Sequence, residues 1–476
     1  MTYNDLYING AWRSGSGGER FDVLNPADET LLASVASASE PDAVAAVDAA
    51  HDAFSAWAGL EPRERGEILR KAFELMQDRL EDIARLITLE NGKARADAMG
   101  EAAYAAEFFR WFSEEAVRGE GMLTRAPSSG ARTLVHYKPA GIAVLVTPWN
   151  YPAAMGTRKI APALAAGCPV VIKPAAETPL TMLALMPLLE EAGVPPGVVN
   201  VLPTGDPGPV VDTMLQDPRV RVVSFTGSTA VGRKLLRSSA AQVIKPAMEL
   251  GGNAPFLVFE DADIDAAVEG CMLAKMRNLG EACTAANRIF VHESVASTFV
   301  ERFTARMQAL QVGDGLAEGI DVGPLVNAAT RDKVAAMVAD AVAKGARIRC
   351  GGVAPKGKGF FYPPTVLTDV PREADCCHEE IFGPVAAIQT FTNEADVIAR
   401  ANETEYGLAA YVFTEDLRRG LAVSEQLEFG MVGLNRGLVS DPAAPFGGVK
   451  QSGLGREGGH EGMLEFMESQ YISTNW

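Results

Sequence analysis

Hydrophobic residues recur at spacings of three and four along residues 41–120, for example in PDAVAAVDAAHDAFSAWAGL and between Arg65 and Leu89. This spacing places the apolar side chains on one face of a helix, so it predicts a mainly helical N-terminal region. From residue 140 the pattern changes to short, continuous apolar runs, each followed by a turn and a helix-like stretch. The first runs are GIAVLVTPWN, PVVIKPA, GVVNVLPTG and VRVVSFTGS.

The short apolar runs predict a doubly wound α/β fold, because β-branched strands that alternate with helices are typical of a parallel sheet covered on both faces. A second α/β series begins at Asn253 with APFLVF, continues through RIFVH and FYPPTVL, and ends near Gly448. Sheets of this kind bind ligands at the carboxyl ends of their strands. In the first series those ends carry Trp149, Asn150, Lys173, Pro203, Gly227 and Ser228.

Two strand-like segments fall outside both series. They are residues 124–140 (TRAPSSGARTLVHYKPA) and residues 464–476 (LEFMESQYISTNW). Their alternating character predicts a hairpin and an edge strand that pair with another subunit. We therefore expect a homodimer or a homotetramer.

Composition narrows the classes of partner. The chain has 476 residues, of which 47% are hydrophobic and 22% charged, as in a globular protein with two or three domains. Its formal charge of -18 disfavours binding to nucleic acid or to an anionic membrane, because both need a basic surface. A small molecule is the expected partner. With no long apolar run and no secretory signal pattern at the start, the protein is expected to be cytoplasmic.

The cysteines and histidines argue against a metal site. No pair of cysteines has CxxC spacing, and the vicinal pair at 376–377 is poorly placed for a bridge, so free thiols are expected. The five histidines stand far apart in the sequence, which also disfavours zinc. The six cysteines are Cys168, Cys271, Cys283, Cys350, Cys376 and Cys377.

Cys283 has unusual neighbours. It lies in NLGEACTAANR, between a helix-like segment (263–278) and a strand-like one (287–292), which predicts a loop position. A core cysteine usually packs among large aliphatic residues, whereas small neighbours leave this thiol reachable. Catalytic residues concentrate in such loops. These residues alone leave an inert structural thiol as the alternative.

Two further segments contain candidate functional groups. In FTGSTAVG, Gly227 and Ser228 end a strand and Gly232 lies in the following helix, an arrangement that can hold a phosphate group. The spacing departs from GxGxxG, so a simple turn is the alternative. In MELGGNAP, Glu249 stands beside two glycines at the junction of the two α/β series. By itself it could equally be a solvated or ion-paired side chain.

Taken together, these segments resemble the aldehyde dehydrogenase superfamily along essentially the whole chain. The resemblance implies a dinucleotide-binding domain (1–121 and 140–250), a catalytic domain (251–450) and oligomerisation segments (122–139 and 458–476). The matching motifs are TPWNYP (147–152), IKPAAETP (172–179), FTGS (225–228), ELGG (249–252), GEACTAANR (280–288), EEIFGP (379–384) and PFGGVKQSGLGRE (445–457).

The resemblance implies that the Cys283 thiolate attacks an aldehyde carbon to give a thiohemiacetal. The Asn150 amide and the Cys283 backbone N–H would bind its oxyanion, and hydride would leave to NAD or NADP. Glu249 would then activate the water that hydrolyses the thioester. The family usually has Gln where Glu281 stands, and a carboxylate there could oppose formation of the thiolate.

The same resemblance implies the cofactor contacts. Lys173 would reach the ribose of the adenosine half, Ser228 and the helix after it the pyrophosphate, and Glu380 the nicotinamide ribose. Phe382 would pack at the nicotinamide end, and Trp149 is also expected to contact the cofactor. Family members that prefer NAD usually carry a glutamate where Ala176 stands, so we expect NADP to be accepted at least as well as NAD.

Within the superfamily the chain most resembles the succinate-semialdehyde dehydrogenases. MGTRK (155–159), KMRN (275–278) and GLVSD (437–441) match positions that bind a substrate carboxylate there. The resemblance implies that Arg158, Arg277 and Ser440 hold the carboxylate. Asn150 and Arg158 are eight residues apart, a little over two helical turns, which predicts that both face the same cleft. A structural ion pair is the alternative for either arginine, and an enzyme for uncharged or aromatic aldehydes is the alternative function. Ala285 replaces the second cysteine of a redox switch found in some relatives.

Overall fold

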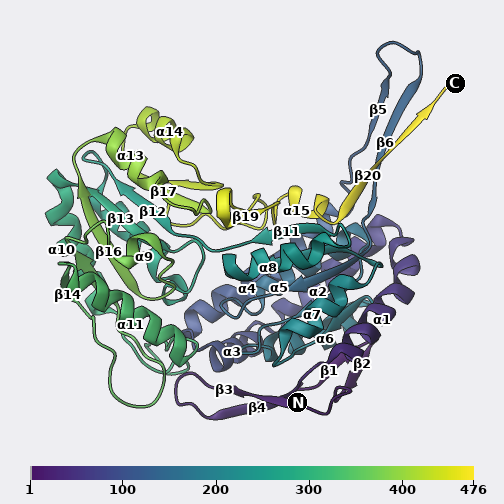
Figure 1. Cartoon of the computed structure of the whole chain (residues 1–476), viewed down its shortest axis with the longest axis horizontal. Helices are drawn as coiled ribbons and strands as arrows, with labels where there is room; N and C mark the ends of the chain where they lie inside the picture. Colours follow the sequence, from purple (N-terminus) through teal and green to yellow (C-terminus); the bar gives the residue numbers. More distant parts are fainter. Residues whose placement is uncertain (1–2) are drawn as a thin grey trace.

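Two large sheets organise residues 3–476, the part of the chain that this computed structural model describes (Figure 1). The first sheet has eight strands in the order β19-β11-β10-β7-β8-β9-β1-β2. Its five central strands are parallel, and β1, β2 and β19 are antiparallel to their neighbours. The strands are β1 (Leu6–Ile8), β2 (Ala11–Arg13), β7 (Ile142–Val146), β8 (Val170–Lys173), β9 (Val199–Val201), β10 (Val220–Thr226), β11 (Lys245–Glu249) and β19 (Gly453–Leu454).

Helices cover both faces of this sheet. In β7, Ala143 and Leu145 pack with residues of α2 to α6, whereas Ile142, Val144 and Val146 pack with residues of α1, α7 and α8. Such alternation is what a doubly wound sheet requires, so the predicted fold class is confirmed. These helices are α1 (Glu40–Ala58), α2 (Pro62–Gln77), α3 (Leu80–Asn91), α4 (Arg95–Glu115), α5 (Ala154–Ala166), α6 (Leu180–Ala192), α7 (Pro207–Gln216) and α8 (Thr229–Ala240).

The second sheet has seven strands in the order β14-β15-β16-β13-β12-β17-β18, all parallel except β14. Its strands are β12 (Ala254–Val258), β13 (Ala286–His292), β14 (Arg347–Cys350), β15 (Thr365–Thr368), β16 (Val385–Phe391), β17 (Ala409–Phe413) and β18 (Met431–Leu434). The helical elements that follow β11 are α9 (Ile264–Met276), η1 (Arg277–Gly280), α10 (Glu293–Ala309), α11 (Ala328–Ala343), α12 (Asp375–His378), α13 (Glu394–Asn402), α14 (Leu417–Gln426), η2 (Lys450–Ser452) and α15 (Glu461–Leu464).

A third sheet projects away from both lobes (Figure 1). The hairpin of β5 (Met122–Arg125) and β6 (Arg132–Pro139) pairs antiparallel with β20 (Met467–Thr474). The predicted hairpin and edge strand are therefore present, and they join each other. A fourth sheet contains β3 (Arg20–Leu24) and β4 (Leu31–Ala36). The first sheet takes β19 from residues 453–454, whereas its other strands end at residue 249.

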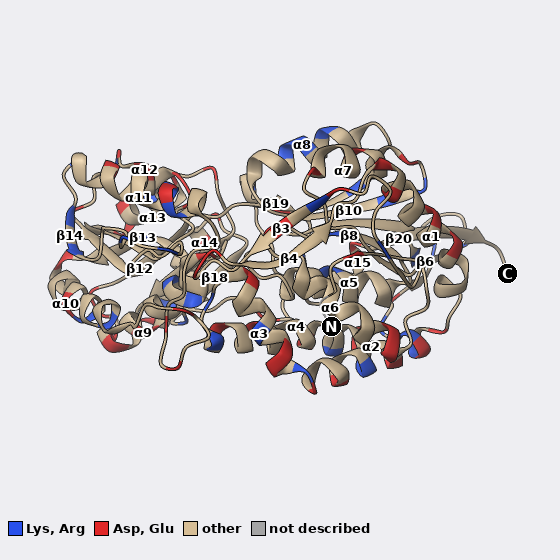
Figure 2. Cartoon of the chain, turned by 90° about the horizontal axis from the view of Figure 1, so that it is seen from below, with Lys and Arg blue, Asp and Glu red and all other residues tan. Residues whose placement is uncertain are grey.

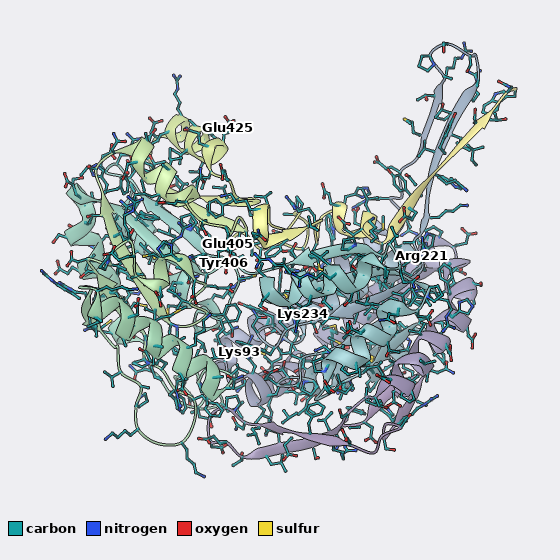
Figure 3. All side chains as sticks on the ribbon, viewed as in Figure 1. Lys93, Arg221, Lys234, Glu405, Tyr406 and Glu425 are labelled. Atoms are coloured by element: carbon teal, nitrogen blue, oxygen red, sulfur yellow. The ribbon has the colours of Figure 1, made fainter. Side chains whose placement is uncertain are left out.

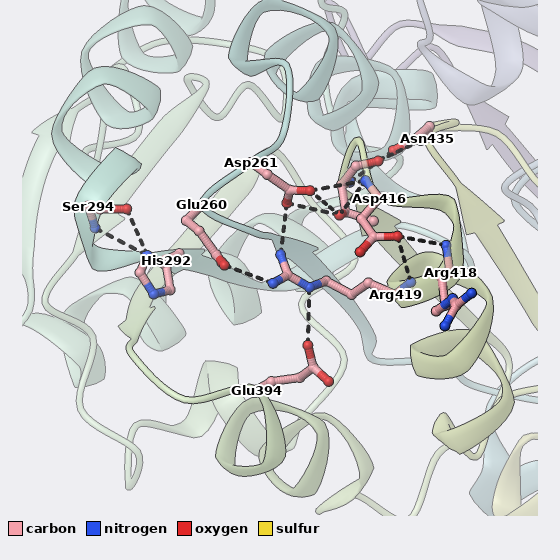
Figure 4. A network of polar contacts seen from close by, with 10 residues as sticks. Glu260, Asp261, His292, Ser294, Glu394, Asp416, Arg418, Arg419 and Asn435 are labelled. Carbon is pink, nitrogen blue, oxygen red and sulfur yellow. Dashed lines mark hydrogen bonds and ion pairs between the residues drawn. The ribbon is translucent and has the colours of Figure 1, made fainter.

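Lys, Arg, Asp and Glu residues are spread along the ribbons of both lobes (Figure 2). One polar cluster on the second lobe centres on Arg419, which lies 2.9 Å from Glu260, 2.9 Å from Asp261 and 3.3 Å from Glu394 (Figure 4). These contacts join the turn after β12 to α13 and α14, so the cluster is structural. In residues 3–476, no helix is long and apolar enough to cross a membrane, and no group of three potential metal ligands is present.

Candidate active site

Cys283 lies in the loop between η1 and β13, as predicted, and is half-buried. Asn278, Leu279 and Gly280 enter this loop with φ angles of 51°, 43° and 82°. A side chain at position 280 would clash, because a Cβ there would lie 2.3 Å from the carbonyl oxygen of Gly383. A Cβ on Gly252 would similarly lie 2.1 Å from the Cys283 carbonyl oxygen. The glycines therefore let the catalytic loop approach both neighbouring segments closely.

Two cavities meet at Cys283 and Asn150, which line both of them. We call the first the arginine cavity; its other lining residues include Tyr104, Tyr151, Arg158, Arg277, Ser440 and Phe446. The second is the strand-end cavity, which has a volume of about 320 Å³ and is lined by residues that include Trp149, Gly227, Ser228, Lys333, Glu380 and Phe382. Cys283 is the only cysteine among the residues that line these two cavities, and its thiol is therefore reachable from two sides.

The side chain of Asn150 is held by a hydrogen bond from its amide Nδ2 to the Glu281 carbonyl oxygen, at 3.0 Å. The Asn150 carbonyl oxygen accepts from Lys93 Nζ at 2.7 Å, and Lys93 forms a buried ion pair with Glu101. Glu101 in turn accepts from the backbone N–H of Ala153 beside α5. Lys93 lies in the region between the two lobes (Figure 3). An amide has two N–H donors, so one remains for a ligand at Cys283.

Asn150 and Arg158 line the same cavity, as predicted, but not because they share a helix. Asn150 precedes α5, which begins at Ala154. Turn residues between β7 and α5, and not a shared helical face, therefore bring the two side chains to one cavity.

The Cys283 thiol is protonated in this state. Burial, together with Glu380 and Glu249, raises its pKa to about 12, although Arg158 and Arg277 act in the opposite direction. Formation of the thiolate therefore needs a base or a change of surroundings.

Glu249 ends β11 and is buried, and neither of its carboxyl oxygens has a hydrogen-bond partner. It lines neither cavity, but it is close enough to influence the pKa of Cys283. Burial, and then the charge of Glu457, raises the pKa of Glu249 well above its ordinary value. The raised pKa favours the protonated form, so Glu249 must lose its proton before it can act as a base, and its unpartnered oxygens are then free to accept a proton.

The surroundings of Glu281 disfavour the charge that its sequence position suggested. Its side chain is fully buried, and its Oε1 accepts a hydrogen bond from the Val326 backbone N–H at 3.2 Å. Burial raises the pKa of Glu281 well above the ordinary value, which favours the neutral carboxylic acid. A neutral carboxyl group resembles the amide of glutamine in size and polarity.

The two arginines of the arginine cavity have different partners. Arg158 is buried, donates to the Tyr104 hydroxyl, lies 3.5 Å from Glu457 and stacks 4.1 Å from the Phe446 ring centre. The predicted alternative of an ion pair therefore applies in part to Arg158. Arg277 donates to the Tyr151 hydroxyl at 3.1 Å and has no carboxylate within 4 Å among the described residues. Its charge remains available to an anionic ligand.

The strand-end cavity brings together most of the predicted cofactor residues. Ser228 is the exposed N-cap of α8 and accepts from the Val231 N–H at 3.4 Å. Gly232 allows α8 to pack closely, because a Cβ there would lie 2.4 Å from Leu250. A helix N-terminus beside an open cavity suits a phosphate group.

The nicotinamide-end candidates come from the other lobe. Glu380 Oε1 accepts from the Gly252 N–H at 3.1 Å, and burial raises the pKa of Glu380 to about 7. The rings of Phe382 and Trp149 meet edge to face with their centres 5.3 Å apart. Phe382 has a φ of 56°, so its backbone is held in a left-handed conformation.

Lys173 and Ala176 follow the end of β8 and lie outside the lining of the strand-end cavity. Burial lowers the pKa of Lys173 to about 8, against the attraction of Glu177. Ala176 is partly exposed, and so is Glu177. The structure therefore keeps a cation and an uncharged methyl group at this strand end.

Sequence reasoning missed the residues that support the site. Tyr104 and Tyr151 hold the arginines, and Lys93 and Glu101 fix Asn150. Glu457, at the end of the quoted motif PFGGVKQSGLGRE, joins Arg158 to the buried Lys159. Glu457 and Tyr151 had a signal, because each lies inside a matching motif; the other partners lie outside those motifs.

A helix N-terminus that suits a phosphate group and a reachable cysteine line one cavity, an arrangement typical of a nucleotide-dependent oxidoreductase with a thiol nucleophile. The model of the aldehyde dehydrogenase family matches residues 12–472, and the chain belongs to this family. It is 55% identical to a succinate-semialdehyde dehydrogenase of Paenarthrobacter nicotinovorans over 93% of this chain and 98% of that protein. It is 48% identical to the Escherichia coli succinate-semialdehyde dehydrogenase [NADP(+)] GabD, over 98% and 96%.

The fold agrees with a solved relative. A crystal structure titled as an E. coli NADP-dependent enzyme superposes with a TM-score of 0.98 at 47% identity, and the match covers all of this chain and 98% of the other. The family and the fold class predicted from the sequence are therefore confirmed.

Proposed function

We propose that this aldehyde dehydrogenase oxidises succinic semialdehyde to succinate with NADP or NAD. The observation that carries the proposal is the meeting of two cavities at Cys283, one with a free arginine and one beside a helix N-terminus. The first suits an aldehyde with a distal carboxylate, and the second suits a dinucleotide. The similarity to succinate-semialdehyde dehydrogenases supports this substrate.

The residues present fit the cofactor. The N-terminal N–H groups of α8 and the exposed Ser228 hydroxyl would hold the pyrophosphate, and Glu380 would accept from ribose hydroxyls. Trp149 and Phe382 would pack at the reactive end of the cofactor. When bound, the dinucleotide accepts a hydride from the substrate carbon. Lys173 stands at a neighbouring strand end for the adenosine half.

In the proposed mechanism, Cys283 loses its proton and its sulfur attacks the aldehyde carbon. The free N–H of the Asn150 amide and the Cys283 backbone N–H stabilise the resulting oxyanion. After hydride departs, a thioester remains on Cys283. Glu249, whose carboxyl oxygens have no other partner, takes a proton from the water that hydrolyses the thioester. This sequence releases a carboxylic acid and restores the thiol.

Arg277 is the principal carboxylate-binding residue in this proposal, and Arg158 and Ser440 assist it. Arg277 has a tyrosine hydroxyl as its side-chain partner, whereas Arg158 already lies beside Glu457. Burial opposes the charge of Arg277, but the surrounding tyrosines outweigh this effect and raise its pKa, so the guanidinium stays charged. A charged donor in a partly enclosed cavity favours an anionic substrate.

We propose that NADP is accepted at least as well as NAD because of Ala176. A methyl group at that position neither repels a 2'-phosphate nor accepts hydrogen bonds from ribose hydroxyls. Lys173, three residues earlier, supplies a nearby positive charge.

A panel of aldehydes tested with both cofactors checks the proposed function. Succinic semialdehyde should have the highest kcat/KM, and butanal, which has the same chain length without the carboxylate, should be at least about tenfold poorer. A preference for butanal or for benzaldehyde would instead establish the alternative, an enzyme for uncharged or aromatic aldehydes. Product formation should not depend on coenzyme A, since Glu249 is present to activate water.

We also propose that the protein is a homo-oligomer that pairs through the third sheet. This sheet exposes large apolar side chains, including Leu123 at 59% and Tyr471 at 60%. Exposed apolar strands at a sheet edge favour pairing with another chain. A cytoplasmic location is proposed because all six cysteines are free, as expected in a reducing compartment.

A further inference from the structure

A separate surface cavity lies beside the vicinal cysteines. Its volume is about 250 Å³, and it is lined by Arg288, Phe290, Arg372, Glu373, Cys377, His378, Gln389, Arg400 and Glu403. It shares no residue with the arginine cavity or the strand-end cavity. Cys377 lies in α12, three residues before Glu380, and is 8% exposed.

Arg288 is a buried cation that lacks a carboxylate partner. Its guanidinium donates to the backbone carbonyl oxygens of Asn253, Arg400 and Ala401, and no carboxylate lies within 4 Å of it among the described residues. Buried charges in proteins are normally paired. On the cavity wall, the negative form of Cys377, and after it the carboxylate of Glu403, would offset the charge of Arg288.

Two consecutive hydrogen bonds, from Arg400 to Gln389 and from Gln389 to Cys377, form a donor chain that ends at the Cys377 sulfur. Arg400 donates to Gln389 Oε1 at 2.6 Å, which fixes the orientation of the Gln389 amide. The amide Nε2 is therefore directed to the Cys377 sulfur, at 3.1 Å. A fixed N–H donor favours the thiolate, although the Pro371 carbonyl oxygen, 3.4 Å from the sulfur, is an acceptor for the thiol form.

The surrounding charges agree with this assignment. The hydrogen bond from the Cys376 thiol, followed by Arg288 and Arg400, lowers the pKa of Cys377 despite its burial and the opposing charge of Glu373. On the same wall, Glu403 is paired with Arg372 at 2.7 Å.

From this geometry we propose that Cys377 is an oxidant-modified thiolate, and that the ligand of its cavity is a small hydroperoxide. The Cys377 sulfur attacks one peroxide oxygen, so an S–O bond forms while the O–O bond breaks. The sulfur is oxidised to a sulfenic acid, and the peroxide is reduced to an alcohol, or to water if it is hydrogen peroxide. The leaving oxygen anion takes a proton from solvent in the open cavity.

Cys376 does not close a disulfide with Cys377 in this reaction. Adjacent Cα atoms are about 3.8 Å apart, which is shorter than the usual span of a disulfide. The sulfenic acid therefore persists until an external thiol enters the cavity and reduces it.

Modification of Cys377 also affects the neighbouring active site. The Cys377 carbonyl oxygen accepts from Asn253 Nδ2 at 3.2 Å, and α12 leads directly to Glu380. An added oxygen atom on this buried sulfur displaces α12, and cofactor binding weakens. The weakening of cofactor binding rests on the proposed role of Glu380, whereas the oxidation of Cys377 does not.

Peroxide treatment of the full-length protein tests the site. The protein is exposed to limiting hydrogen peroxide at about pH 7 with dimedone as a sulfenic acid trap, and each cysteine peptide is quantified by mass spectrometry. Cys350 is the matched control: it is more exposed than Cys377, but burial raises the pKa of its thiol. Cys377 should be trapped about tenfold faster than Cys350. Equal or faster trapping of Cys350 would overturn the proposal.

Variants of the donor chain sharpen this test. Gln389→Leu removes the N–H donor and should slow trapping of Cys377 severalfold without changing that of Cys350. Arg400→Gln, at a partly exposed position, provides the same test if the first variant does not fold. Unchanged trapping of Cys377 in a folded variant would count against a thiolate held by this chain.

A binding measurement tests the consequence separately. In the Cys283→Ala variant, peroxide should weaken NADPH binding severalfold, and adding Cys377→Ser should remove this effect. Unchanged binding with a fully trapped Cys377 would overturn the coupling to Glu380. Failure of NADPH to bind before any treatment would instead contradict the proposed function.

Discussion

The arginine cavity and the strand-end cavity share Cys283 and Asn150 but are built from different groups. The arginine cavity is defined by charged and aromatic side chains that fix one another, such as Arg158 between Tyr104 and Phe446. The strand-end cavity is defined largely by backbone: a helix N-terminus, glycines and a loop with a positive φ at Phe382. Side chains therefore select the substrate, whereas main-chain groups bind what all dinucleotides share.

We predict that Cys283, which lines both cavities, is essential for turnover and dispensable for cofactor binding. Cys283→Ala should lower turnover by at least about 10³-fold because it removes the nucleophile. NADPH binding should persist, since the helix N-terminus of α8 is unchanged. Steady-state rates and fluorescence titration measure the two effects. Normal turnover in this variant would rule out the proposed nucleophile.

Substitution in the arginine cavity should affect only one class of aldehyde. Arg277→Gln removes a charge that has no carboxylate partner, so KM for succinic semialdehyde should rise about tenfold or more. The values for butanal should hardly change. Arg158→Gln is a less selective comparison because Arg158 also contacts Glu457. Equal losses with both aldehydes for Arg277→Gln would show that Arg277 is structural.

Substitution beside β8 should change the choice of cofactor and not the choice of aldehyde. Ala176→Glu places a carboxylate near the adenosine ribose, so kcat/KM for NADP should fall about tenfold more than for NAD. Kinetics with both cofactors at saturating aldehyde measure this difference. Ala176→Gln is the matched control for size without charge. If both cofactors weaken alike in Ala176→Glu, position 176 does not discriminate between them.

The smallest effect is expected at Glu281. If this carboxyl group is already neutral, Glu281→Gln leaves kcat and the pH profile nearly unchanged, within about twofold. Activity should rise with pH in both proteins, because the raised pKa of Cys283 keeps its thiol protonated at neutral pH. A charged Glu281 would behave differently: its removal would lower the pKa of Cys283 and move the rising limb to lower pH.

Short-range patterns in the sequence predicted the positions of main-chain features well. Apolar runs identified the strands that end at Lys173 and beside Ser228, because continuous burial leaves a local signature. Helical periodicity did not reveal the break in the segment from Arg65 to Leu89, where α2 ends at Gln77 and α3 begins at Leu80. Both helices are amphipathic and pack on the same core, so one pattern of apolar spacing continues across the break between them.

Side-chain partnerships across the fold could not be predicted from local patterns. Tyr104 meets Arg158 and Tyr151 meets Arg277 only after α4, α5 and η1 pack together. The raised pKa of Glu281 likewise follows from burial, which no neighbouring residue in the sequence indicates. Both properties depend on tertiary contacts.

The most direct test of the proposed chemistry is the intact mass of the Glu249→Gln variant after mixing with succinic semialdehyde and NADP. The amide that this substitution introduces cannot accept a proton from water, so hydrolysis should slow while acylation proceeds. The account predicts an acyl adduct on the Cys283 peptide and a rapid burst in which one NADPH forms per active site. A slowed steady state with neither an adduct nor a burst would contradict the thioester mechanism.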